Sequence, residues 1–327
     1  EQPLIDLDAA GVLKGGTLIR HDYEQIALFG EVTFNITPTL DLIAGLRWAS
    51  EKITNLERLT GVFRYDFGSN PPTTTPEQFG PISDRFDAVT PRVVLSWQPV
   101  EGWTLYGSVS KGFRSGGFVG VTPFDPDEVI NYEVGAKGRF ADGRASLASA
   151  VYYIDWKDTQ AFDDIPDPPF FAVLNIGDVE VRGLELEASF MPIDGLEIAL
   201  GGAYTDTEVV RVSENATANV GLIKGNRMQK VPEYTLHAVT TYRWPIFGRY
   251  MASVSANALK VDSSYSDFRN LPEEKVPGYT TFGLRAGVEN DNWGVFLIGK
   301  NLTDERVVLD ISVPPSPVVG VQVARPR

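Results

Sequence analysis

The feature that most constrains this chain is a repeat of two alternating strands joined by a very short turn, after which a long polar segment follows. The short connections, rich in Pro, Gly, Asp and Asn, fall near residues 37–39, 99–102, 141–143, 192–195, 245–248 and 290–292. The longer segments between them are 54–83, 116–127, 158–170, 206–231, 261–277 and 303–318. They are too long and polar to be simple hairpin turns. Short turns at one rim and long loops at the other predict an all-β, antiparallel transmembrane β-barrel with about 12 strands.

The predicted strands have one apolar and one polar face. Between Arg182 and Phe190, for example, the apolar residues Leu184, Leu186, Ala188 and Phe190 alternate with Gly183, Glu185, Glu187 and Ser189. Alternate side chains of a strand point to opposite faces, so one face could meet lipid and the other water. A soluble two-sheet sandwich would show the same alternation, so this pattern alone leaves both architectures open.

Aromatic residues favour the membrane alternative because many of them flank the short turns. Amphipathic rings gather at the level of lipid headgroups, where they form a girdle around a barrel. The alternative is ordinary packing at the ends of hairpins, since aromatic residues favour strands in general. The predicted girdle consists of Trp97, Trp103, Phe140, Phe190, Tyr242, Trp244, Tyr250 and Trp293.

Composition excludes several classes of protein. No run of about 18 apolar residues could form a membrane helix, so a chain of this kind spans a bilayer only as a closed barrel. The mean hydropathy of -0.10 is compatible with a barrel, whose strands average apolar and polar faces. The net charge of -14 and the lack of a basic stripe argue against binding to nucleic acid. Residues 1–8 show no signal peptide, so we expect the sequence to start inside a larger protein or after processing.

The residue types needed for catalysis are scarce, and we predict neither catalytic residues, nor a cofactor, nor a metal site. His21 and His237 are the only histidines, and there is no cysteine, so no Cys/His pair or zinc cluster of recognised spacing exists. The cluster Asp158, Asp163, Asp164 and Asp167 could bind calcium, but its spacing matches no EF-hand loop. A solvated acidic loop is the favoured interpretation.

Arginines and aromatic residues in the long segments are the candidate ligand-binding groups. A guanidinium both pairs with oxygen atoms and stacks on rings, so this combination suits an anionic, ring-bearing ligand. The alternative for each residue is ordinary loop packing. The candidates, expected near the extracellular mouth, are Arg114, Phe118, Phe170, Phe171, Arg227, Tyr265, Phe268 and Arg269.

Several short motifs resemble the barrel of TonB-dependent outer-membrane receptors. They occur in the family's order and are Leu105–Phe118 (LYGSVSKGFRSGGF), Asn131–Lys137 (NYEVGAK), Tyr152–Trp156 (YYIDW), Asn175–Glu187 (NIGDVEVRGLELE) and Gly299–Glu305 (GKNLTDE). The resemblance implies a barrel of about 22 strands in the outer membrane of a Gram-negative bacterium. It also implies import of a bulky, scarce nutrient, foremost a ferric siderophore, with energy supplied by the inner-membrane TonB complex.

Two departures from the family pattern shape the expected domain organisation. The N-terminal plug, through which the family contacts TonB, has no counterpart here, and residues 324–327 resemble the entrance to a last strand that does not follow. We therefore expect residues 1–327 to be a partial barrel domain in which residues 1–21 are an extracellular loop. The expected partners are the lipid bilayer, TonB and a small-molecule ligand. A passive porin-like channel and a soluble β-rich binding module remain alternatives.

Overall fold

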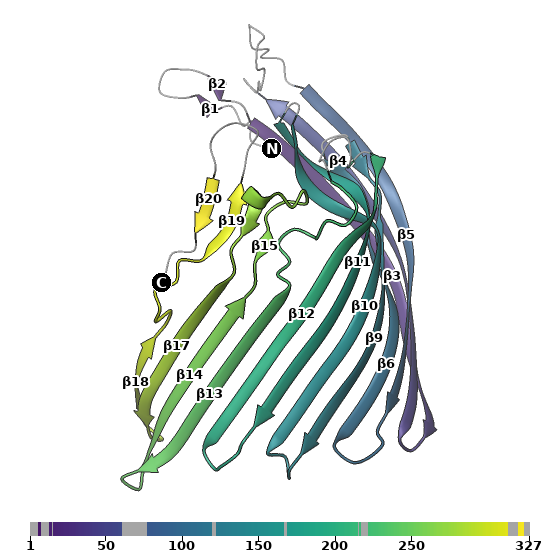
Figure 1. The fold of residues 1–327 in the computed structure, drawn as a ribbon. Helices are drawn as coiled ribbons and strands as arrows, with labels where there is room; N and C mark the ends of the chain where they lie inside the picture. Colours follow the sequence, from purple (N-terminus) through teal and green to yellow (C-terminus); the bar gives the residue numbers. More distant parts are fainter. Residues whose placement is uncertain are drawn as a thin grey trace.

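The dominant element of the computed structural model is one antiparallel sheet of 12 strands that follow each other in chain order from β3 to β18. Figure 1 shows this sheet curved along its width. The structure describes residues 6–7, 13–14, 16–60, 77–119, 122–166, 169–214, 216, 222–312 and 320–323. The 12 strands are β3 (Gly16–Thr37), β4 (Leu40–Thr60), β5 (Glu77–Trp97), β6 (Trp103–Arg114), β9 (Asp127–Phe140), β10 (Ala145–Pro166), β11 (Pro169–Phe190), β12 (Leu196–Val212), β13 (Tyr234–Ile246), β14 (Tyr250–Val261), β17 (Tyr279–Glu289) and β18 (Gly294–Gly299).

Small elements lie in the connections from β6 to β9 and from β14 to β17 and in the segments before β3 and after β18, toward the opposite end of the sheet from the short turns. Four two-stranded ribbons pair β1 with β2, β7 with β8, β15 with β16 and β19 with β20. Among the described residues, no helix is long and apolar enough to cross a membrane. The bounds of the small elements are β1 (Asp6–Leu7), β2 (Leu13–Lys14), β7 (Gly117–Val119), β8 (Thr122–Phe124), β15 (Ser264–Tyr265), η1 (Pro272–Glu274), β16 (Lys275–Val276), β19 (Val308–Ser312) and β20 (Gly320–Val323).

All six predicted short turns are confirmed, because each lies between two paired strands of the sheet. The turn chemistry explains their positions. The connection between β9 and β10, for example, places Ala141, Asp142 and Gly143 at positive φ, a conformation that glycine and, to a lesser extent, aspartate tolerate best.

Several long segments predicted as loops are instead strand over part of their length. Strand β4 continues to Thr60, β10 to Pro166, and β11 begins at Pro169, so the expected loops 54–83 and 158–170 are wrong over these parts. Likewise β3 begins at Gly16, inside the predicted loop 1–21. Ladder hydrogen bonds need no apolar side chains, so a hairpin continues as strand where both faces meet water and the alternation fades. Residues 61–76, 167–168 and 324–327 lie outside the described residues.

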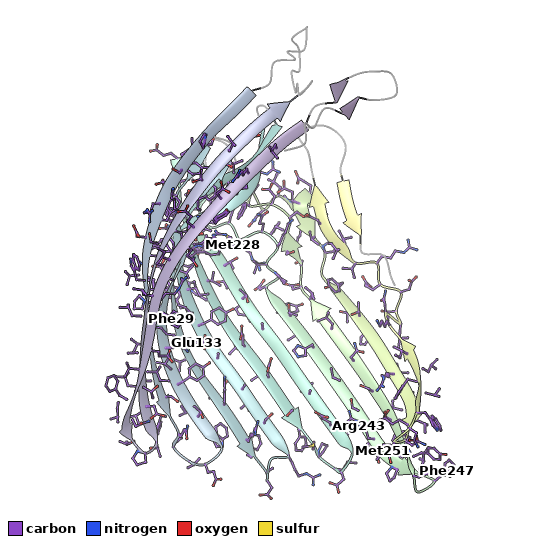
Figure 2. All side chains as sticks on the ribbon, turned by 180° about the vertical axis from the view of Figure 1, so that it is seen from behind. Phe29, Glu133, Met228, Arg243, Phe247 and Met251 are labelled. Atoms are coloured by element: carbon purple, nitrogen blue, oxygen red, sulfur yellow. The ribbon has the colours of Figure 1, made fainter. Side chains whose placement is uncertain are left out.

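The register gives the sheet one polar and one apolar face, as predicted. In the pair β11 and β12, Leu186 faces Gly202 on one side, while Glu187 faces Gly201 on the other. We call the side that carries Glu133, Glu185 and Glu187 the lumen face. The other side, which carries Leu184, Leu186 and Phe190, is the outer face. Figure 2 shows side chains projecting from both faces along the strands.

The outer face exposes many large apolar side chains. Val134 is 68% exposed, Val151 59% and Leu297 79%, and these residues belong to β9, β10 and β18. Water-soluble proteins rarely expose such a continuous apolar surface. This face therefore fits contact with lipid and argues against the soluble-module alternative.

Candidate functional site

The lumen face carries polar groups that are bonded to each other across the strands. The Tyr106 hydroxyl donates a hydrogen bond of 2.6 Å to Glu133, and Arg243 forms an ion pair of 3.7 Å with Glu197. Such cross-strand pairs stabilise a sheet. They also leave a hydrophilic wall, along which hollows of about 460 Å³ and 600 Å³ lie.

Glycines on this wall let aromatic rings lie flat against the backbone. A Cβ atom at Gly183 would overlap the ring of Tyr152, and one at Gly135 would overlap the ring of Tyr106. The absence of a side chain is what allows this close approach. The rings of Tyr152 and Tyr106 therefore lie over the glycine backbone of the neighbouring strand.

The eight predicted girdle residues lie near the short turns and share the outer face. Three ring pairs form there: Trp103 of β6 stacks on Phe140 of the neighbouring strand β9 with centroids 6.0 Å apart. Tyr242 stacks on Trp244 at 5.1 Å, and Tyr250 contacts Trp293 at 5.6 Å. This arrangement is the one expected of rings at a membrane interface. The girdle itself stays a prediction.

At the long-loop end of the sheet, Arg114 is held by a buried carboxylate. Asp127, whose side chain is 4% exposed, lies directly opposite Arg114 in the register of β6 and β9. It accepts hydrogen bonds from the Arg114 guanidinium and, at 3.1 Å, from the backbone N–H of Gln160. The guanidinium also lies 5.8 Å from the centre of the Trp156 ring. Arg114 is therefore oriented by its neighbours, and half of its side chain remains exposed.

Gln160 connects this pair to the segment 115–126, which links β6 to β9. Its side-chain amide donates to the carbonyls of Ser115 at 2.9 Å and Asp125 at 2.8 Å. Asn175 donates to the same Asp125 carbonyl at 2.9 Å and accepts from the Asp125 N–H at 2.8 Å. The segment that carries Phe118 is thus fixed to β10 and β11.

A second charged cluster joins β10, β11 and β12 beyond the apolar band of the outer face. Arg211 donates to Asp178 at 2.7 Å and 3.0 Å and to Asp158 at 2.6 Å. Burial alone would raise the pKa of Asp178, but the hydrogen bonds from Arg211 and Asp158 and the charges of Arg211 and Lys157 outweigh it and lower that pKa. The hydrogen bonds that Arg211 donates to Asp178 and Asp158 raise the pKa of Arg211. Both groups are therefore held in their charged forms.

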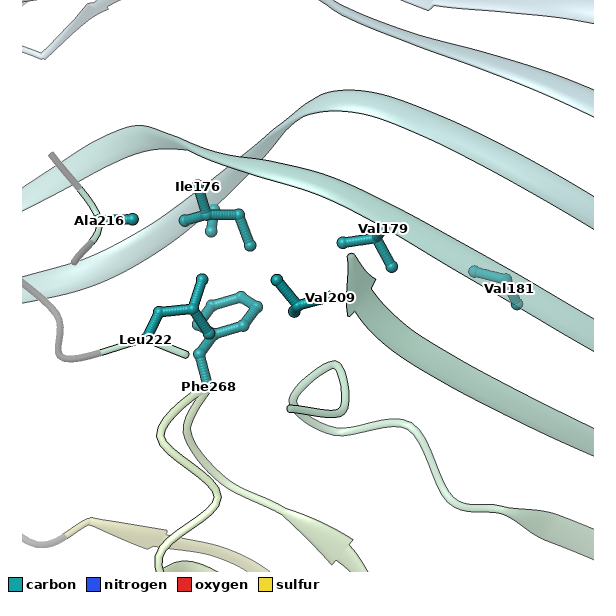
Figure 3. Close-up of a cluster of buried hydrophobic side chains, with 8 residues drawn as sticks. Ile176, Val179, Val181, Val209, Ala216, Leu222 and Phe268 are labelled. Carbon is teal, nitrogen blue, oxygen red and sulfur yellow. The ribbon is translucent and has the colours of Figure 1, made fainter. Parts of the chain in front are cut away.

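The long connections fold onto the sheet around a small apolar core. Ile176 and Val179 of β11 and Val209 of β12 pack with Leu222 and Phe268 from two separate connections. Figure 3 shows the Phe268 ring directed toward the strands, next to Leu222. Asn226 donates a hydrogen bond of 2.8 Å to the Phe268 carbonyl, which ties the two connections together.

Arg269, which follows Phe268, is held by carboxylates. It forms an ion pair of 3.2 Å with Asp267 and another with Glu274 of η1. Burial raises the pKa of Glu274, the charge of Asp267 raises it further, and Arg269 offsets part of this effect. The ion pairs of Arg269 therefore fix the connection from β14 to β17 next to the point where Phe268 packs in the apolar core.

The structure separates the predicted ligand-binding residues into three groups. Phe268 is 2% exposed, so its predicted availability to a ligand is wrong: its ring packs in the loop core. Arg114, Phe118, Arg227, Tyr265 and Arg269 keep part of their surface exposed at the long-loop end. Phe170 and Phe171 lie in β11, but their side chains fall outside the described part of the chain.

Sequence reasoning missed the carboxylates that hold these arginines. The clearest signal was available for Asp127, because it and Arg114 lie at matching ends of two strands joined by one connection. Asp178 and Arg211 are similarly close in register. Opposite charges at such positions form cross-strand pairs.

Comparison with known proteins gives a consistent result. The sequence model of a family described as TonB dependent receptor-like, beta-barrel, matches residues 6–302. The probable TonB-dependent siderophore receptor PiuA of Acinetobacter baumannii is 25% identical over 292 residues, which are 83% of this chain and 35% of that protein. The metal-pseudopaline receptor CntO of Pseudomonas aeruginosa is 28% identical over 229 residues, 67% of this chain and 30% of that protein.

Solved structures show the same fold. The ferric yersiniabactin uptake receptor FyuA of Yersinia pestis matches with a TM-score of 0.78 at 19% identity, over 95% of this chain and 45% of that one. The siderophore receptor PiuA of Acinetobacter baumannii matches with a TM-score of 0.69 at 22% identity, over 94% of this chain and 42% of that one. The chain thus spans about a third of the length of the curated relatives it matches.

Proposed function

We propose, from the premise that this chain belongs to the TonB-dependent receptor-like β-barrel family, that it forms part of the barrel wall of an outer-membrane receptor that imports a ferric siderophore. The family consists of transport receptors rather than enzymes. The observation that carries the proposal is the 12-stranded meander with short turns at one end and long, folded connections at the other. The names of the relatives PiuA and CntO support a metal complex as the cargo.

The two faces of the sheet support the membrane part of this proposal. An apolar outer face with aromatic rings near the turns fits a bilayer, and a wall lined by Glu133, Glu185 and Glu187 fits a hydrated lumen. The short turns would then face the periplasm and the long connections the outside of the cell.

The long-loop end supports the ligand part. Arg114 and Arg269 are each oriented by carboxylates and keep exposed surface. An oriented guanidinium beside aromatic rings can pair with the oxygen atoms of an anionic complex and stack on its rings. We propose that Arg114, Phe118, Arg227, Tyr265 and Arg269 contribute to this binding surface.

Uptake assays test the proposal directly. The complete gene that encodes this chain is expressed in a Gram-negative strain that lacks its own siderophore receptors, and the uptake of radioactive iron is measured with hydroxamate, catecholate and mixed-ligand siderophores. We expect uptake of at least one ferric complex, and we expect it to stop when TonB is deleted. Uptake that continues without TonB would favour the passive channel. A complete lack of uptake of every ferric complex would overturn the siderophore proposal.

A further inference from the structure

A groove of about 520 Å³ crosses the outer face over strands β11 to β17, on the side away from the lumen. Leu186 and Leu200 form one wall, and Phe282 forms the other. The groove is lined almost entirely by apolar groups. An apolar hollow on a lipid-facing surface fits an acyl chain.

Small residues create this hollow. In one row across the sheet, Ala238 and Ala258 face each other between Leu200 and Phe282. In the next row toward the long connections, Gly202 lies between Leu186 and Leu236. Larger neighbours surround a low floor, so the groove is a consequence of side-chain size on adjacent strands and needs no backbone distortion.

A lysine closes the groove at its end nearest the long connections. Lys260 lines the groove, and its Nζ atom lies 5.2 Å from the centre of the Tyr234 ring. Tyr204 faces Tyr234 across the strands. Among the residues that the structure describes, no carboxylate pairs with Lys260, and Glu233, which precedes Tyr234, is paired with Arg227 at 3.5 Å.

The Lys260 ammonium group on a lipid-facing surface is stabilised by an anionic partner at the same depth in the membrane. Long lysine side chains extend along apolar surface to place the ammonium group at the membrane interface, and tyrosine rings favour the same level. Basic groups there pair with lipid phosphates. Asp206 lies one residue pair beyond Tyr204 toward the long connections on this face, opposite Arg182, whose ion pair of 2.6 Å is with Glu180.

We propose that this groove is a binding site for a phosphorylated lipid of the lipid A type, with an acyl chain in the hollow and a phosphate paired with Lys260. Because Lys260 lies at the long-loop end of the sheet, the bound lipid would belong to the outer leaflet. This choice rests on the outer-membrane location given under the proposed function.

Native mass spectrometry of the full-length receptor tests the site, with diphosphorylated lipid A, dephosphorylated lipid A and phosphatidylglycerol as probes. We expect lipid A to bind most tightly and Lys260→Gln to weaken its binding about tenfold, the size of one charge-assisted hydrogen bond. Ala258→Leu, which fills the hollow, should weaken the binding of all three lipids. Lys111→Gln is the matched control, because Lys111 lies on the same face of β6 and pairs with Glu128 at 2.7 Å.

The outcomes separate this inference from the proposed function. Equal lipid A binding by the native receptor and the Lys260→Gln variant would overturn the inference, as would equal binding of phosphatidylglycerol and lipid A. A dimer that buries this face in place of lipid would also overturn it. Iron uptake should be unchanged in Lys260→Gln. If uptake is absent from the native receptor while lipid A binding still depends on Lys260, the transport proposal fails and the lipid site stands.

Discussion

Replacing Asp127 with Asn should release the segment that links β6 to β9. The carboxylate is 4% exposed and accepts hydrogen bonds from Arg114 and from the backbone N–H of Gln160. Hydrogen bonds to a charged group contribute about 1.5–3 kcal/mol. Because Arg114 is half exposed and can turn to water, we expect the free energy of local opening to fall by about 2 kcal/mol rather than by the sum of the bonds.

Hydrogen exchange of the full-length protein measures this effect. A loss of about 2 kcal/mol corresponds to exchange roughly 30 times faster in residues 115–126 and around Gln160. Glu128→Gln is the matched control: Glu128 is adjacent in sequence but forms an exposed ion pair with Lys111, which contributes less than about 1 kcal/mol. Equal exchange in the two variants would refute the view that Asp127 anchors this segment.

Gly183→Val should displace the Tyr152 ring and lower thermal stability by about 1–3 kcal/mol, whereas Gly30→Val, where no atom lies within 4 Å, should not; equal unfolding temperatures would contradict this. Phe268→Ala should cost about 3–5 kcal/mol and speed proteolysis in the long connections, and unchanged cleavage would refute its role in the core. Because the pKa of Asp178 is lowered from its ordinary 3.8, its contribution is complete above that value and is lost as the pH falls through the lowered pKa. Hydrogen exchange of the β11 backbone around Asp178 should therefore accelerate only below about pH 4. Acceleration already near pH 6 would contradict this.

The membrane-facing half of the fold was predictable from the sequence because two strong local signals coincide there. Turn residues such as Gly143 and Gly195, both at positive φ, mark the hairpins, and lipid on one face with water on the other enforces a period of two. Beyond the membrane both faces meet water, so that period disappears. The strand segments that end at Thr60 and Pro166 were accordingly mistaken for loops.

The site was predictable in its residue types but not in its packing. Arginines and aromatic residues in the long connections were identified, yet nothing local distinguishes Phe268, which is buried, from Tyr265, which is half-buried. The difference depends on Ile176, Val209 and Leu222, which are distant in sequence and meet only after the connections fold onto the sheet. Tertiary contacts of this kind leave no periodic pattern.

The central claim is that the sheet spans a membrane with its two faces in lipid and in water. This chain contains no cysteine, so single cysteines can be placed along β10 and spin-labelled in the full-length protein, reconstituted in bilayers, once any cysteine outside these 327 residues has been replaced by serine. Accessibility to oxygen and to a water-soluble nickel complex should alternate with a period of two: Val151 and Tyr153 should favour oxygen, and Ala150 and Tyr152 the nickel complex. Uniform accessibility to the nickel complex along the strand would contradict the account.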